Sequence, residues 1–189
     1  MEKWKKSEFQ NTCVKIEHVT KRFGEDLVLK EVNLTLKVGQ VYGVVGNNGS
    51  GKTVLMKCIC GFIVPEIGQI KLFGKKVSRK KMPTDNMGII IENPGFMEDE
   101  TAMKNLQYLA KLNNHIEKKQ VEKTIIRVGL DPKEKKKVKN YSLGMRQRLA
   151  IAQAIMEEQD VIILDEPMNG LDIEGVKQVR QLLLELKNE

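Results

Sequence analysis

Hydrophobic and polar residues alternate in two stretches near the start of the chain. Residues 14–17 read Val-Lys-Ile-Glu, and residues 32–38 continue the same alternation over a longer span that ends at Gly39. Successive side chains of a strand point to opposite faces, so a period of two separates an apolar face from a polar one. We predict two strands of an antiparallel sheet that has one face in water.

Three other stretches, residues 41–45, 89–91 and 161–164, are apolar without alternation. A continuous apolar run is typical of a strand that is covered on both faces. A short helix is predicted over 53–60, with Gly61 available to cap its C-terminal end. Strands separated by helices indicate a mostly parallel sheet in this part of the chain.

Helical periodicity replaces the strand pattern in two other regions. Apolar residues between 100 and 129 recur on one helical face, which predicts a small helical lobe over about 92–141. A further helix follows Gly144, and the last helix carries a long apolar stripe made of Val176, Val179, Leu182, Leu183 and Leu186. Such a stripe must pack against another element.

Composition and charge narrow the class of protein. Of 189 residues, 41% are hydrophobic and 30% charged, as in a globular protein. We expect no membrane-spanning helix, which needs roughly 20 apolar residues, and no secretory signal. With three cysteines, too few for a disulfide framework, we predict a cytoplasmic protein. The net charge of +7 suits nucleic acid, nucleotide or an anionic membrane surface and does not choose among them.

Two local features have ordinary interpretations. The basic run at residues 133–139 is best read as a solvated loop, with contact to lipid headgroups or nucleic acid as the alternatives. Cys58 and Cys60 have no second cysteine pair to complete four metal ligands, so we expect them to be partly buried helix residues.

Residues 46–53 have the complete G-x-x-x-x-G-K-T pattern of a phosphate-binding loop, between a predicted strand and a predicted helix. The glycines let backbone N–H groups curl around phosphate oxygens, and the helix adds its positive dipole end. Lys52 is expected on the β- and γ-phosphates and the Thr53 hydroxyl on Mg²⁺. The expected nucleotide ligands in this loop are Gly46, Asn47, Asn48, Gly49, Ser50, Gly51, Lys52 and Thr53.

Asp165 and Glu166 follow the predicted strand at 161–164. A carboxylate at this strand end lies beside the phosphate loop in such an architecture, so Asp165 is expected to hold Mg²⁺ through water. Glu166 is expected to act as the general base that polarises the attacking water. Acidic turn residues without a function are the alternative, and the phosphate loop counts against it.

Two more segments complete the pattern of a known family. Residues 141–148, Tyr-Ser-Leu-Gly-Met-Arg-Gln-Arg, resemble the signature of ATP-binding cassette (ABC) proteins, and residues 169–172, Asn-Gly-Leu-Asp, resemble the D-loop of that family. The chain therefore resembles an ABC nucleotide-binding domain from about residue 12 to residue 189. The resemblance implies an α/β P-loop NTPase fold, with a RecA-like, mostly parallel core sheet, an antiparallel β subdomain and a small α-helical subdomain.

The same resemblance implies how the chain is divided. It predicts a single ABC ATPase domain over 1–189, with its catalytic core in residues 12–91 and 142–189 and its helical subdomain at about 92–141.

The resemblance also implies a mechanism. Two domains pair head to tail around two ATP molecules, and the signature of each domain closes the nucleotide held by the other. Ser142 and the Gly144 N–H are the implied donors to the γ-phosphate, and Phe23 lies where the family places an aromatic residue that stacks on adenine. For Ser142 an N-cap role is compatible with this one, whereas a core position is the alternative for Phe23. Bound ATP holds the two domains together, and its hydrolysis lets the dimer open.

The sequence departs from the family pattern at two points. Glu92 stands where the family has a glutamine. This glutamate variant is similar to the ATPases of bacitracin-type and lantibiotic-immunity exporters. Glu92 is therefore an expected nucleotide-site residue, with neutral drift as the alternative. The histidine that contacts the γ-phosphate has no counterpart, since neither His18 nor His115 can serve. We therefore expect a C-terminally truncated chain, which lacks the strand that carries this histidine, binds ATP and hydrolyses it poorly.

These observations predict an ATP-binding and ATP-hydrolysing subunit of an ABC exporter for a peptide antibiotic or similar small amphiphile. ATP and Mg²⁺ are the expected cofactors, and a separate membrane-spanning permease and a second copy of the domain are the expected partners. Such a protein is cytoplasmic and peripheral on the inner face of the cell membrane. The alternative is a soluble ABC ATPase that acts on nucleic acid or ribosomes, but nucleic acid is the less favoured partner. A GTPase would need an N-K-x-D segment, which we do not find.

Overall fold

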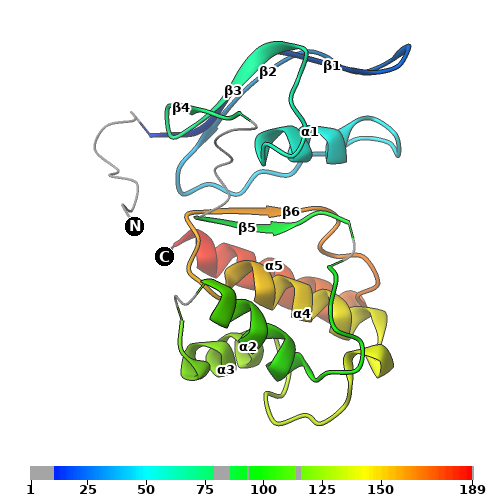
Figure 1. The fold of residues 1–189 in the computed structure, drawn as a ribbon, viewed down its shortest axis with the longest axis vertical. Coiled ribbons are helices and arrows are strands. Elements are labelled where there is room, and N and C mark those ends of the chain that lie inside the picture. Colours follow the sequence, from blue (N-terminus) through cyan, green and yellow to red (C-terminus); the bar gives the residue numbers. More distant parts are fainter. Residues whose placement is uncertain (1–10, 79–85, 93, 114–115, 189) are drawn as a thin grey trace. The chain divides into compact units, whose positions relative to one another are not determined.

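The computed structural model describes residues 11–78, 86–92, 94–113 and 116–188. The chain divides into two compact units, Met1–Asp85 and Asn86–Glu189, whose elements are drawn in Figure 1. The predicted division into a catalytic core and a helical subdomain stays a prediction. No described helix is both long and apolar enough to cross a membrane.

The first unit contains an antiparallel sheet in the order β2-β1-β3-β4. Its strands are β1 (Thr12–Phe23), β2 (Asp26–Lys37), β3 (Ile67–Leu72) and β4 (Lys75–Lys76). Val14 lies opposite Leu36 of β2 and Leu72 of β3. Val14 and Ile16 are each only 2% exposed, while Lys15 points to solvent. The predicted antiparallel strands with one wet face are thus confirmed.

Helix α1 (Lys52–Ile59) follows the glycine-rich loop, as predicted. Gly61 adopts a left-handed φ of 79° and donates its N–H to the carbonyl of Cys58 at 3.1 Å, and Phe62 donates to that of Lys57 at 2.9 Å. This pair of bonds is a Schellman motif, which satisfies carbonyls at the end of the helix. Burial raises the pKa of Cys58 to about 11 and that of Cys60 to about 12, as for core thiols.

The predicted strand at 41–45 is the exception. Residues 40–47 have no regular secondary structure, and Val45 is 96% exposed. An apolar run without alternation indicates that the side chains tend to be buried. It does not indicate which neighbouring strand would form backbone hydrogen bonds with it. Among the described residues, no strand pairs with this segment, so the prediction is wrong for this structure.

The second unit contains two parallel strands and most of the helices. Strand β5 (Met87–Ile90) pairs in parallel with β6 (Val161–Leu164), with Met87 opposite Val161 and Ile90 opposite Leu164. The helices are α2 (Ala102–Asn113), α3 (Lys118–Arg127), the 3-10 helix η2 (Val138–Asn140), α4 (Leu143–Ile155) and α5 (Ile173–Lys187). Helices α2, α3 and η2 lie within the predicted range 92–141, and α4 and α5 are the two helices predicted after it.

The core of this unit joins all of these elements. Leu106 of α2, Ile125 of α3, and Leu149 and Ile151 of α4 are completely buried. The apolar stripe of α5 packs against them through Val179 and Leu182, with Leu183 and Leu186 partly covered. The apolar stripe predicted from the sequence therefore packs against other elements of this unit.

Candidate nucleotide-binding site

The phosphate-loop residues form a tight turn in front of α1. The Ser50 N–H donates to the Asn47 carbonyl at 3.1 Å, and Gly49 and Gly51 adopt left-handed φ values of 80° and 86°. A Cβ atom on Gly46 would lie 2.6 Å from Ser50 Oγ, so the two ends of the turn approach each other closely. Only glycine accepts these positions without strain, which is why the motif repeats it.

Lys52 is the first residue of α1, and its side chain bends back over the loop. Its Nζ donates to the carbonyl oxygens of Gly46 at 2.8 Å and Asn47 at 3.0 Å. The ammonium group is thus held at the turn, at the N-terminus of a helix, where the helix dipole also favours an anion. A phosphate oxygen would be a stronger partner than these carbonyls because both groups would then be charged.

Phe23 ends β1 and is 46% exposed, so the alternative that it is a core residue is wrong. Lys21 Nζ lies 5.0 Å from the centroid of its ring, within range of a cation–π contact. Lys21 also pairs with Glu66, whose other oxygen accepts the Arg22 N–H at 2.7 Å. These bonds lower the pKa of Glu66 and hold the segment around Phe23 in place.

The acidic pair follows β6 in the second unit. The Asp165 N–H donates to the Ile90 carbonyl at 2.7 Å, which extends the β5–β6 ladder up to the first carboxylate. Glu166 has a left-handed φ of 48°, a conformation that costs of order 1–3 kcal/mol for a non-glycine residue. Its carbonyl accepts the Asn169 N–H at 3.0 Å and Gln147 Nε2 at 3.4 Å. The chain therefore turns sharply out of the strand at the proposed base.

The signature residues lie at the start of α4. Ser142 is the N-cap, since its Oγ accepts the Met145 N–H at 3.2 Å, which confirms the N-cap role. A Cβ atom on Gly144 would lie 3.4 Å from the Gly170 carbonyl, and one on Gly170 would lie 2.2 Å from Leu143 Cδ2. The signature thus packs directly against the segment after Glu166.

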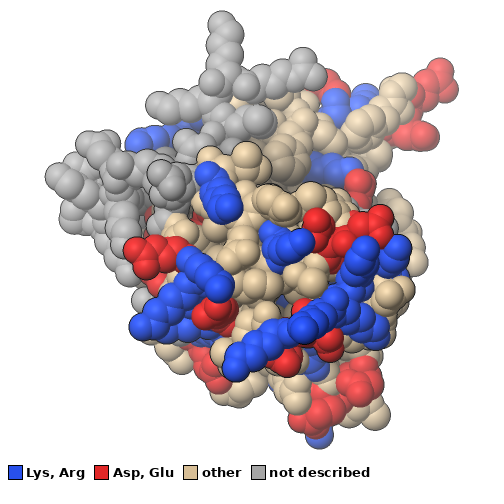
Figure 2. Space-filling view, turned by 60° about the horizontal axis from the view of Figure 1, so that its bottom comes forward, with Lys and Arg blue, Asp and Glu red and all other residues tan. Residues whose placement is uncertain are grey.

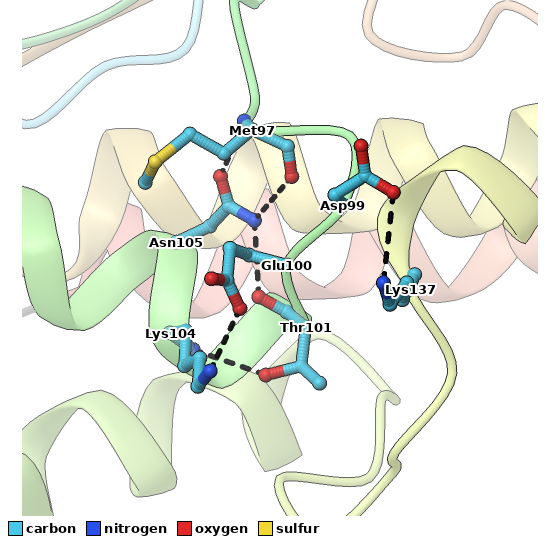
Figure 3. A network of polar contacts seen from close by, with 7 residues as sticks. All are labelled: Met97, Asp99, Glu100, Thr101, Lys104, Asn105 and Lys137. Carbon is cyan, nitrogen blue, oxygen red and sulfur yellow. Dashed lines mark hydrogen bonds and ion pairs between the residues drawn. The ribbon is translucent and has the colours of Figure 1, made fainter.

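Glu92 lies just beyond β5, exposed and with a left-handed φ of 64°. The loop that follows is held by Asn105 of α2, which is 3% exposed. Its side chain accepts the Met97 N–H at 2.7 Å and donates to the carbonyls of Met97 at 3.1 Å and Thr101 at 3.0 Å, as Figure 3 shows. Sequence reasoning missed Asn105, although an asparagine among the buried positions of a helix was a usable signal.

A second contact joins this loop to the signature helix. Arg146 of α4 binds both carboxylate oxygens of Glu98, at 2.5 and 2.8 Å, and lowers the pKa of Glu98. The neighbouring Asp99 pairs with Lys139 at 2.6 Å and with Lys137 at 3.6 Å, the latter drawn in Figure 3. These residues lie more than 35 positions apart in the sequence, so no local pattern could have indicated them.

Each unit therefore assembles its own share of the predicted site. The first holds Phe23 and the loop 46–53, and the second brings Ser142–Gly144, Glu166 and residues 169–172 together. Of the two histidines that sequence analysis set aside, His18 lies in β1 with its Nδ1 3.3 Å from Glu31 Oε1, and His115 lies outside the described residues.

Comparison with known proteins agrees with the motifs. Residues 29–169 match the ABC transporter family. The chain is 43% identical over 178 residues to the bacitracin transport ATP-binding protein BcrA of Enterococcus faecalis. The aligned residues are 93% of this chain and 58% of that protein. It is 33% identical to the lantibiotic transport ATP-binding protein SrtF of Streptococcus pyogenes, over 93% of this chain and 76% of that one.

A solved structure shows the same fold. The cbiO1 protein of Clostridium perfringens, described as part of the ABC transporter complex cbiONQ, superposes with a TM-score of 0.81 and 28% identity, over 95% of this chain and 75% of that one. The chain belongs to the ABC transporter family, and the predicted P-loop fold class is confirmed. It spans 58% of the length of the bacitracin relative.

Proposed function

We propose that this chain is the ATP-binding and ATP-hydrolysing subunit of an ABC exporter, driven by ATP-dependent dimerisation. The observation that carries the proposal is the turn at residues 46–53, which opens a helix and holds the Lys52 ammonium where an anion would bind. The family match and the ATP-binding relatives support a nucleotide as that anion.

In the first unit, the loop backbone and Lys52 bind the phosphates, and Phe23 stacks on the adenine ring. The exposure of Phe23 supports this role, since a buried ring could not receive a base. Base-to-aromatic stacking contributes about 1–3 kcal/mol. Asn47, Asn48 and Ser50 complete the loop.

In the second unit, Glu166 would be the general base, Asp165 would hold Mg²⁺ through water, and Glu92 would be a nucleotide-site residue. In the first unit, the Thr53 hydroxyl would be a Mg²⁺ ligand. Hydroxyl and carboxylate oxygens are the donors that Mg²⁺ prefers, and the bound ion would neutralise charge on the phosphates. Asp165 is positioned by its backbone bond to Ile90. Glu166, which follows Asp165 directly and has a left-handed φ of 48°, would take a proton from water.

Ser142 and the Gly144 N–H would donate to the γ-phosphate of a nucleotide bound by a second copy or a similar domain. Ser142 Oγ already accepts the Met145 N–H and keeps its own proton available. Gly144 lies in the first turn of α4, where N–H groups have no intrahelical partner. Both features suit an anion that arrives from outside the chain.

The proposed cargo is a peptide antibiotic or a similar small amphiphile. The names of the bacitracin and lantibiotic relatives support it, and the Glu92 variant resembles such exporters. The proposed partner is a separate membrane-spanning permease, which would hold this subunit on the inner face of the cell membrane. Action on nucleic acid or ribosomes has no specific observation in its favour.

The test is calorimetry of the whole chain with Mg·ATP. We expect Lys52→Ala to lower the affinity for Mg·ATP by at least about tenfold, because the loop then lacks its only side-chain cation. Lys30→Ala, an exposed lysine of β2, is the matched control and should bind as the unaltered chain does. No heat from Mg·ATP, or equal affinities in the two variants, would contradict the proposal.

A further inference from the structure

The basic residues of this chain are concentrated at one end of the second unit. Residues 117–140 hold nine lysines and arginines against four acidic residues, which accounts for +5 of the chain's net charge of +7. They form α3 and the loop that follows it. Figure 2 shows lysine and arginine side chains in a band, with acidic side chains between them.

The lysines of α3 lie on its outer face. Val121, Thr124 and Ile125 are buried against the core, which turns Lys118, Lys119 and Lys123 toward solvent. Ile126 lies on the same outer face and is 61% exposed. The face therefore combines three basic side chains with one large apolar side chain.

The acidic residues of the loop are turned to its backbone. Asp131 Oδ1 accepts the Lys133 N–H at 2.8 Å, and Glu134 Oε1 accepts the Lys136 N–H at 2.9 Å. Among the described residues, no ion pair is formed by the ammonium groups of Lys133, Lys135 or Lys136, and all three residues are exposed. Their charge is thus not neutralised by a close partner.

The loop has a rigid base. Val138 is fully buried, and its N–H donates to the Glu100 carbonyl at 2.9 Å. Lys137 forms a β-bridge with Thr101 and pairs with Asp99. The backbone that carries Lys133, Lys135 and Lys136 is thus anchored at its C-terminal end.

We propose that Lys118, Lys119, Lys123, Lys133, Lys135 and Lys136, here called the basic surface, bind the anionic headgroups of a phospholipid membrane. This inference rests on the proposed function, which brings the chain to a membrane. Clusters of this size bind acidic lipids through their summed charge. Nucleic acid is the weaker alternative, because the basic surface offers no aromatic side chain on which a base could stack.

The test is co-sedimentation of the whole chain with vesicles of phosphatidylcholine alone or mixed with phosphatidylglycerol. We expect binding only to the mixed vesicles, and its loss at high salt, because a Debye length of about 3 Å at 1 M salt screens the charges. Lys133→Glu/Lys135→Glu/Lys136→Glu should weaken binding by at least about a hundredfold, since each lost cation near the membrane contributes about fivefold and the added carboxylates are repelled.

The matched control is Lys30→Glu/Lys37→Glu/Lys76→Glu, which changes the net charge equally on exposed positions of the first unit. It should bind the mixed vesicles as the unaltered chain does. Equal binding to both vesicle types, an equal loss in both variants, or tighter binding of single-stranded DNA than of mixed vesicles would overturn the proposal. Calorimetry with Mg·ATP on the same variants separates this outcome from a failure of the proposed function, because the basic surface holds no nucleotide ligand.

Discussion

Asn105 shows how one side chain can order the loop beside a proposed site. Its side chain makes three hydrogen bonds to backbone groups of Met97 and Thr101, and its position on α2 buries it. A buried polar group without a partner costs about 1–3 kcal/mol. The loop from Glu92 to Thr101 therefore depends on an amide that no catalytic motif includes.

We predict that Asn105→Ala lowers the free energy of unfolding by about 2 kcal/mol, because the Met97 N–H loses its partner and the carbonyls of Met97 and Thr101 each lose one of two hydrogen bonds. Urea unfolding followed by circular dichroism measures this. Lys111→Ala, an exposed change on the same helix, should stay within about 0.5 kcal/mol of the unaltered chain. Equal stabilities of the two variants would show that the loop does not depend on Asn105.

Gly88 of β5 gives a second test at this scale. A Cβ atom there would lie 1.8 Å from the Ala154 carbonyl oxygen of α4, so strand and helix touch through their backbones. Gly88→Ala should lower the free energy of unfolding by at least about 2 kcal/mol through overpacking. Gly95→Ala, where a Cβ would meet nothing within 4 Å, is the control and should change stability little. A tolerated Gly88→Ala would mean that β5 and α4 are farther apart.

At the scale of elements, sequence patterns predicted what depends on neighbours along the chain. Alternation indicated β1 and β2, and the cap residues Gly61 and Ser142 were found from helix-end chemistry. The strand predicted at residues 41–45 was wrong, because an apolar run indicates that its side chains tend to be buried but does not indicate which strand it would pair with. The candidate phosphate-loop residues were predicted from motif spacing, and the signature residues from the family resemblance. Asn105 and the Glu98–Arg146 pair depend instead on tertiary contacts.

The Glu98–Arg146 pair ties the loop after Glu92 to the first turn of the signature helix. Arg146 lowers the pKa of Glu98 in the folded state. The stabilisation from this carboxylate is therefore present above its ordinary pKa and is lost as the pH falls through the lowered value. Both side chains are solvent-accessible, so we expect the effect on global stability to be small.

We predict that Arg146→Gln raises the pKa of Glu98 toward its ordinary value, because the guanidinium that favours the charged form is gone. A pH titration of the Glu98 carboxyl by NMR measures the change. Lys104→Gln, which removes the partner of Glu100 instead, should leave the titration of Glu98 where it was. A pKa of Glu98 that is the same in Arg146→Gln and in the unaltered chain would disprove the pairing.

At the scale of the whole molecule, the proposed function requires two copies or two similar domains. The signature packs against residues 169–172 and leaves Ser142 Oγ with a proton to donate. No residue within hydrogen-bonding range is shown to take that proton in the described part of the chain. An arriving γ-phosphate is the acceptor that the proposal supplies, so dimerisation should require bound ATP and should end when ATP is hydrolysed.

Glu166→Gln tests that sequence of events. The amide keeps the shape of the side chain but cannot take a proton from water, so ATP hydrolysis should fall by about 10²-fold or more while Mg·ATP affinity is retained. Light scattering should then show a long-lived dimer with Mg·ATP and a monomer without it. Lys52→Ala, which should not bind ATP, must stay monomeric under the same conditions. If Glu166→Gln bound Mg·ATP and hydrolysed it as fast as the unaltered chain does, Glu166 would not be the general base.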